Sequence, residues 1–114
     1  RIGQAQDGLR LWSLFFQDYA VAVMPTSTQP IFEWEEDLRD QATNDRIMEA
    51  QRPMLAVSVL GLPGLSVPTG LYEGVPTGVQ VVSAMFREDL CLDAAEAIEA
   101  HHPMPTPIDP REAF

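Results

Sequence analysis

A serine in a short glycine- and proline-flanked segment is the first candidate for chemistry. Ser66 lies in GLSVP (residues 64–68), which matches the first three positions of the Gly-x-Ser-x-Gly elbow that presents a nucleophilic serine. The elbow needs a glycine two residues after the serine, and Pro68 occupies that position. Another apolar stretch typical of a strand follows, whereas the elbow continues into a helix. We therefore expect Ser66 to be a strand hydroxyl and not a nucleophile.

Few other side chains could act as nucleophiles or metal ligands. His101 and His102 are the only histidines, Cys91 is the only cysteine, and their spacing does not match a metal site. In a nucleotide-binding loop, glycines follow a strand and open a helix. The glycines between residues 70 and 78 do not have this arrangement. We expect no metal and no cofactor, and a packing role for Cys91.

The charged residues restrict both the chemistry and the partners. All seven basic residues are arginines, so no lysine of this chain can act as a base. Seventeen acidic residues give a net charge of −10, which disfavours nucleic acids and anionic membranes as partners. No apolar run approaches the roughly 18 residues of a membrane span, and no targeting signal is visible. From this we expect a cytoplasmic protein.

The elements that would position these side chains alternate between helix and strand. Of the 114 residues, 46% are hydrophobic, which is typical of one globular domain. Residues 4–19 have the apolar periodicity of a helix with a broad buried face. The apolar run 20–24 predicts a strand buried on both faces, and residues 25–36 predict a long loop. Helix followed by buried strand indicates an α/β fold.

The second half of the chain predicts two more helices and a strand pair. Residues 37–50 are expected to be helical, with Leu38, Ala42 and Ile47 facing inward, up to a stop at Pro53. A buried helical turn is expected at 54–60. The remaining predictions are antiparallel strands at 65–67 and 78–82 joined by a long connection at 68–77, a helix from 86 to 98, and a proline-rich tail.

Three motifs, taken in their order and spacing, resemble the C-terminal part of the amidase signature family. They are SVLGLPGLSVPTG (58–70), GVPTGVQVV (74–82) and FREDL (86–90). The segment DYAVAVMPT (18–26) is similar to that family's buried strand ending in Pro-Thr. The resemblance covers roughly residues 9–101. It implies an α/β fold in which a fragment of the family's mixed sheet is flanked by helices.

The resemblance also implies a mechanism that this chain cannot complete by itself. In the family, a serine activated through a second serine on a cis peptide and a lysine forms an acyl-enzyme that water hydrolyses. Those residues belong to the N-terminal and central portions of the family, within and before its Gly/Ser-rich signature, and the signature is not found here. We expect no catalytic residue in this chain, and no activity from the chain alone.

Three residues are expected to line a pocket for the acyl side of a substrate: Thr26, Gln51 and Arg52. Thr26 opens a loop after a buried strand, and loops on a rigid sheet commonly set specificity. In the amidotransferase branch an acidic residue near the position of Gln51 holds the substrate's amino group. The glutamine argues against a glutamine-type substrate. Ser58 likewise stands where the family often has asparagine.

We therefore interpret residues 1–114 as a single C-terminal fragment of an amidase domain, with a core at 9–101 and a tail at 102–114. Its expected partners are the missing N-terminal catalytic portion and a small-molecule amide. Exposed strand edges and an apolar helix face also predict self-association. Two alternatives remain open, namely a non-catalytic interaction module and a subunit of an amidotransferase assembly.

Overall fold

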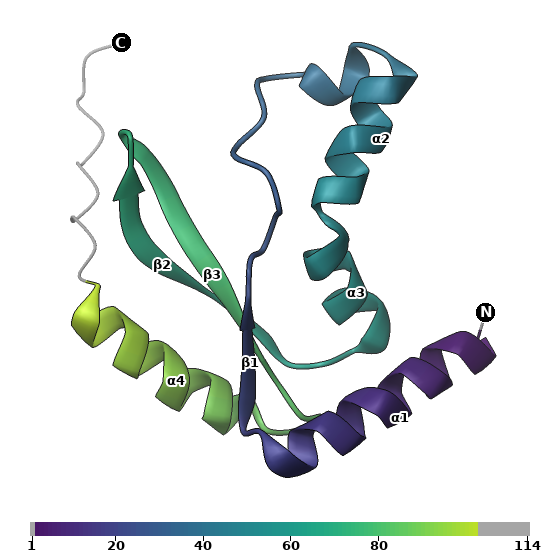
Figure 1. Cartoon of the computed structure of the whole chain (residues 1–114), viewed down its shortest axis with the longest axis vertical. Helices are drawn as coiled ribbons and strands as arrows, with labels where there is room; N and C mark the ends of the chain where they lie inside the picture. The colour runs from purple at the N-terminus through teal and green to yellow at the C-terminus, as the bar shows by residue number, and fades with distance from the viewer. Residues whose placement is uncertain (1, 103–114) are drawn as a thin grey trace, which may run out of the picture.

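The structure is a computed structural model that describes residues 2–102 (Figure 1). Its strands are β1 (Val21–Met24), β2 (Gly64–Tyr72) and β3 (Val75–Ser83). Its helices are α1 (Ile2–Asp18), α2 (Gln41–Ala50), α3 (Arg52–Leu60) and α4 (Glu88–His101), with a 3₁₀ turn η1 (Glu36–Leu38). The predicted α/β class is confirmed. Apart from His102, the predicted proline-rich tail lies outside the described residues.

The three strands form one antiparallel sheet in the order β1-β3-β2. Strand β3 is central, and its Val81 pairs with Val23 of β1 and with Leu65 of β2. Alternate residues of a strand point to opposite faces. Val79 and Val81 therefore face one side of the sheet, and Gln80 faces the other.

Helix α4 covers the face that carries Val81. Val67, Val81 and Cys91 form the buried cluster between the sheet and the helix, and Ala94 and Ile98 of α4 pack against it. The Cys91 thiol lies 3.2 Å from the Ser83 hydroxyl. Cys91 therefore has the packing role expected of it. The opposite face of the sheet is left for the loop after β1 and for α3, which lies across from α4 in Figure 1.

The predicted long connection at 68–77 is wrong. Strands β2 and β3 continue through it, and only Glu73 and Gly74 form the turn. Their φ angles of 50° and 79° are those of a two-residue hairpin turn with both residues left-handed, for which glycine is favoured. A register shift between Pro68 and Gly70 absorbs one residue of β2. The prolines and glycines of this segment belong to a bulged hairpin.

The predicted helix at 37–50 is divided. The backbone leaves η1 after Leu38, and α2 begins after Asp40, whose carboxylate accepts a 2.7 Å hydrogen bond from the Thr43 amide. Ile47 is buried as predicted, whereas Leu38 is 73% exposed because it lies in the turn. Ala42, also predicted to face inward, is exposed.

Residues 52–60 form a full helix rather than a short turn. The proline that was expected to stop the preceding helix lies in the first turn of α3, where its missing amide hydrogen costs nothing. Val57 is the one buried residue of α3. Gly61 ends the helix in the left-handed conformation, with a φ of 68°.

The predicted burial of α1 and β1 is wrong for the described residues. In α1, Leu11 is 68% exposed and Phe15 is 38% exposed. In β1, Val23 is 56% exposed. The apolar patterns are those of buried elements, but little of the described chain covers them.

Candidate functional site

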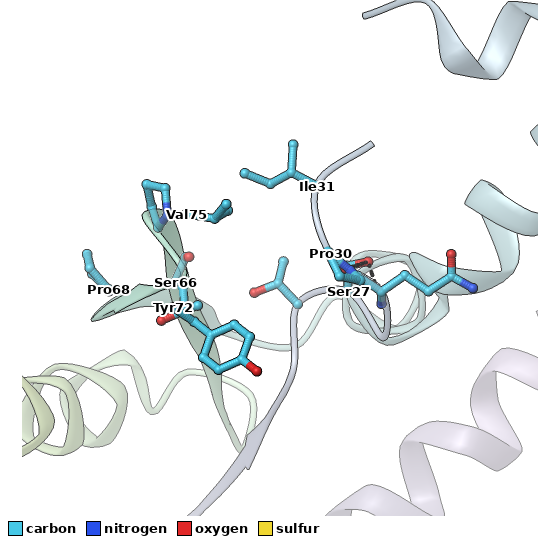
Figure 2. A pocket seen from close by; sticks show the side chains of 12 residues that line it. Ser27, Pro30, Ile31, Ser66, Pro68, Tyr72 and Val75 are labelled. Atoms are coloured by element: carbon cyan, nitrogen blue, oxygen red, sulfur yellow. Dashed lines mark hydrogen bonds between the residues drawn. The ribbon is translucent and has the colours of Figure 1, made fainter. Parts of the chain in front are cut away.

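A groove of about 540 Å³ lies between the segment after β1 and the β2–β3 hairpin (Figure 2). We call it the hairpin groove. Pro30 and Ile31 lie on the side of the segment, and Tyr72, Ser66 and Val75 lie on the side of the hairpin. Its volume falls within the range of small-molecule sites.

The lining of the hairpin groove is apolar with hydroxyl groups and carries no charge. None of the twelve residues that line it is Asp, Glu, Lys, Arg or His. Ile31 is 72% exposed, Tyr72 69% and Val75 40%. The groove therefore offers a substantial free apolar surface to a ligand.

Hydrogen bonds to α2 hold the loop wall of the groove in place. The Thr28 amide donates to the carbonyl oxygen of Ala50 over 2.9 Å. The Arg46 guanidinium donates both to the Gln29 side chain and to the Glu36 carboxylate. Since Gln29 lines the groove, Arg46 fixes this wall without entering the groove itself.

The hairpin wall depends on a close approach of its two strands. A Cβ atom at Gly78 would lie 2.9 Å from the Val67 carbonyl oxygen, so no other residue fits there without moving the backbone. The hydroxyls of Thr69 and Thr77 lie 3.1 Å apart across the hairpin. The wall is thus built by a glycine contact and a cross-strand hydroxyl pair.

A second hollow of about 280 Å³ adjoins the groove, since Thr26 and Ser66 line both. Gln80 lines the smaller one and is only 6% exposed. Its side-chain Nε2 has no hydrogen-bond partner among the described residues. A buried amide without a hydrogen-bond partner costs about 1–3 kcal/mol. The side-chain amide of Gln80 can therefore still take a hydrogen-bond partner from outside the described residues.

The predicted pocket residues are not brought together. Thr26 lies where the two hollows meet. Gln51 lies between α2 and α3, and the exposed Arg52 pairs with Glu49 over 2.8 Å. Neither Gln51 nor Arg52 lines the hairpin groove, and their contact with a substrate stays a prediction.

The other candidates have no catalytic arrangement within residues 2–102. Ser66 is a strand residue at the rim of the groove, as expected. His101 Nδ1 lies 2.8 Å from the Ala97 carbonyl oxygen of its own helix. No group of three His, Cys, Asp or Glu side chains in this range could hold a metal ion. Sequence reasoning missed Ile31 and Tyr72, which no local motif marks.

Glu36 is the titrating group that joins the loop wall to α2. Its carboxylate accepts a 2.7 Å hydrogen bond from the Glu33 amide and faces Arg46, and these contacts hold its pKa below the usual range of a glutamate. A lowered pKa in the folded state stabilises the fold above the unfolded pKa, which is about 4.3 for glutamate. That contribution is lost as the pH falls through the folded value.

Acidification is therefore expected to loosen the loop wall before the sheet unfolds. Below the pH at which Glu36 takes up its proton, which its lowered pKa places under the usual range of a glutamate, amide exchange at residues 28–36 should rise while exchange in β3 stays slow, as measured by hydrogen exchange and mass spectrometry. Glu36→Gln keeps the shape but removes the charge, so it should show the fast loop exchange already at neutral pH. Equal protection of the loop above and below that pH in the unaltered chain, after correction for the intrinsic exchange rate, would contradict the assignment.

Comparison with known proteins identifies the family of this chain. A sequence model described as Amidase matches residues 7–92, which contain every residue of the hairpin groove. The chain belongs to the amidase family. The resemblance found in the three sequence motifs is thereby confirmed.

Relatives within the amidase family include hydrolases and amidotransferase subunits. Indoleacetamide hydrolase of Bradyrhizobium diazoefficiens is 44% identical over 95 residues, covering 80% of this chain and 18% of that protein. A glutamyl-tRNA(Gln) amidotransferase subunit of Exiguobacterium sp. is 36% identical over 85 residues, covering 74% of this chain and 17% of that protein. The amidase-family chain therefore spans about a fifth of the length of these curated relatives.

A solved amidase-family structure has the same fold. The crystal structure of a glutamyl-tRNA(Gln) amidotransferase subunit from Thermotoga maritima superposes with a TM-score of 0.75 at 26% identity. The match covers 87% of this chain and 21% of that one. Among the helices described here, none combines the length and apolar character needed to span a membrane.

Proposed function

We propose that this chain is the C-terminal structural part of an amide hydrolase, in which it forms one wall of the acyl pocket. The observation that carries the proposal is the match to the amidase family over residues 7–92, since this range includes both walls of the hairpin groove. The nucleophilic serine that forms the acyl-enzyme, and the lysine that activates it, lie outside this chain. The chain has no lysine, so it is inactive alone.

The hydrolase is favoured over the amidotransferase subunit by degree of similarity. Two indoleacetamide hydrolases are 44% and 43% identical to the chain, whereas the Exiguobacterium amidotransferase subunit is 36% identical. Gln51, near the place of an acidic residue in the amidotransferase branch, agrees with this choice. The substrate is then a small-molecule amide. The expected cytoplasmic location is also proposed, and the single, reduced Cys91 supports it.

The partner is the catalytic portion of the same enzyme. Leu11 and Leu14 of helix α1, and Tyr19 directly after the helix, are each more than half exposed. Apolar patches of this kind mark interaction sites. In the complete enzyme the catalytic portion covers this face, and in its absence a second copy of the chain does.

The test is a hybrid enzyme in which this chain replaces the matching segment of the Bradyrhizobium diazoefficiens indoleacetamide hydrolase. If the chain is a hydrolase part, the hybrid folds and releases ammonia from arylacetamides. A hybrid that folds, as judged by circular dichroism, but hydrolyses no amide would overturn the proposal. Amide hydrolysis only when a second substrate accepts the ammonia would favour the amidotransferase instead.

A further inference from the structure

We propose that the turn before α2, which combines exposed aromatic and acidic side chains, docks against a cationic surface of the catalytic portion of the enzyme. We call it the acidic-aromatic surface, and it consists of Phe32, Glu33, Trp34, Glu35, Asp37 and Leu38. Because the catalytic portion is the partner, the inference rests on the proposed function. It adds the place of one interface and the chemistry of the surface that meets it.

The acidic-aromatic surface exposes large apolar side chains. Trp34 is 88% exposed, Leu38 73% and Phe32 41%, and all three lie within seven residues of the chain. Apolar side chains gathered in this way mark interaction sites, and tryptophan is among the residues that most often carry the binding energy of an interface. None of the three belongs to the buried cluster between the sheet and α4. Trp34 is therefore the expected anchor of the contact.

The backbone around Trp34 is fixed before any partner binds. Glu35 has a φ of 56°, a left-handed conformation that is uncommon for a residue other than glycine. The Glu36 carboxylate accepts a 2.7 Å hydrogen bond from the Glu33 amide and pairs with Arg46 of α2. Unusual backbone conformations that neighbouring contacts hold in place are typical of binding sites. Since the turn has little freedom left to lose, docking it costs little conformational entropy.

The charge of the surface determines the kind of partner. Residues 33–40 contain five acidic residues and one arginine. Arg39 and Arg46 already pair with other acids of the turn. Glu35 and Asp37 form no ion pair with the described residues. Carboxylates beside an exposed indole match a partner that presents arginine or lysine, because both the carboxylates and the face of the ring attract a cation.

The same charge disfavours the other occupants of this surface. A second copy of the chain has a net charge of −10 as well, so it would bring like charges together. Nucleic acids and anionic membranes are repelled for the same reason. The chain spans about a fifth of its curated relatives, and residues 32–38 lie within the range that matches the family. The rest of such an enzyme is long enough to supply the cationic surface.

The first experiment follows the exposure of Trp34 in the hybrid enzyme. The isolated chain and the hybrid are both labelled with 5-fluorotryptophan, and Trp34→Phe identifies the resonance. The readout is the change of its fluorine chemical shift between light and heavy water, which is large only for a ring in contact with solvent. We expect the full change in the isolated chain and the loss of most of it in the hybrid. An equal change in both proteins would overturn the inference.

The second experiment separates docking from a structural role within this chain. Each variant is made in the isolated chain and in the hybrid, and the thermal midpoint is followed by circular dichroism. Trp34→Ala should shift the midpoint of the isolated chain by less than about 2 °C, because the side chain is exposed there. In the hybrid it should lower the midpoint by about 4 °C or more, as the loss of an anchor does. Equal shifts in the two proteins would contradict docking.

Glu35→Lys tests the charge of the partner. In the isolated chain it relieves repulsion between acids, so the midpoint should stay unchanged or rise. In the hybrid it should lower the midpoint by about 2 °C, since it opposes a cationic surface. Glu96→Lys, at an exposed position of α4, is the matched control and should shift both midpoints equally. A hybrid stabilised by Glu35→Lys, or equal effects of the two lysines in the hybrid, would overturn the cationic partner.

Failure of the proposed function has a different signature. A folded hybrid in which Trp34 is covered, but which hydrolyses no amide, would overturn the hydrolase proposal and support the docking surface. A folded hybrid that releases ammonia while Trp34 keeps its full solvent-dependent shift would do the reverse. A hybrid that does not fold would overturn both, because both require this chain to fit the catalytic portion.

Discussion

Replacing Val81 with aspartate should unfold the sheet and release α4. Val81 is fully buried in the central strand and lies in the cluster with Val67 and Cys91. An aspartate there would bury a carboxylate with no cationic partner among the described residues. Losses above about 4 kcal/mol in the free energy of unfolding are typical of a buried unpaired charge. The whole free energy of unfolding of a small domain is only about 5–15 kcal/mol, so such a loss is a large part of it.

The measurement is the urea midpoint of the 114-residue chain, followed by circular dichroism. Val23→Asp is the matched control, because Val23 is the cross-strand partner of Val81 but is 56% exposed. Its aspartate remains hydrated and should cost less than about 1 kcal/mol. If both variants had the same midpoint, the core would not lie between β3 and α4.

The isolated chain should self-associate through α1, and charges on that helix should disperse it. Leu11, Trp12 and Phe15 form a shallow apolar hollow, and the Phe15 ring stacks on Tyr19 with the ring centres 4.8 Å apart. Leu11, Phe15 and Tyr19 of this cluster are exposed in the described chain, and Trp12 is half-buried. Leu11→Glu combined with Leu14→Glu should shift the chain from dimers or larger species to monomer in sedimentation velocity.

The control for this shift is Leu92→Glu. Leu92 lies on α4, is 61% exposed and is far in sequence from the aromatic cluster. It adds a charge of the same sign without touching α1, so it should leave the dissociation constant within about twofold. An unaltered chain that stayed monomeric at about 100 μM, a concentration at which even a weak dimer is populated, would contradict the account of the exposed face.

Periodicity was sufficient to predict α1 and α4, because their apolar residues repeat at helical spacing over more than ten positions. Their burial could not be predicted equally well. The stripe of α1 is that of a buried helix, yet Leu11 and Phe15 are exposed, since α1 touches little besides α3. Periodicity identifies the apolar face of a helix. It does not show whether other parts of the chain pack against that face.

The hairpin shows why local turn signals can mislead. Pro68, Gly70, Gly74 and Pro76 all favour a loop when taken one at a time. Pro68 is tolerated because β2 is an edge strand of the described sheet. On the outer side of an edge strand no neighbouring strand accepts a hydrogen bond, so the backbone N–H that proline lacks is not needed there. The shift between Pro68 and Gly70 then returns the strand to register. Of these four residues, only Gly74 lies in a turn.

The candidate site was predictable in one residue and hidden in the rest. Thr26 follows an apolar run that predicts a strand, which is a local signal. Ile31 and Tyr72 meet across the groove only after the sheet has formed and Arg46 has fixed the loop. Contacts between residues so far apart in sequence leave no local pattern. Family resemblance was enough for the fold, but the groove had to come from the structure.

The most direct test of the central claim is ammonia release from 1-naphthylacetamide, measured side by side for this chain, for the hydrolase lacking the matching segment, and for the hybrid that joins them. Neither part alone should release ammonia above background, because one lacks the lysine and signature serines and the other lacks a wall of the pocket. The hybrid should release it at a rate within about a hundredfold of the intact hydrolase. Activity from this chain alone, or none from a folded hybrid, would contradict the account.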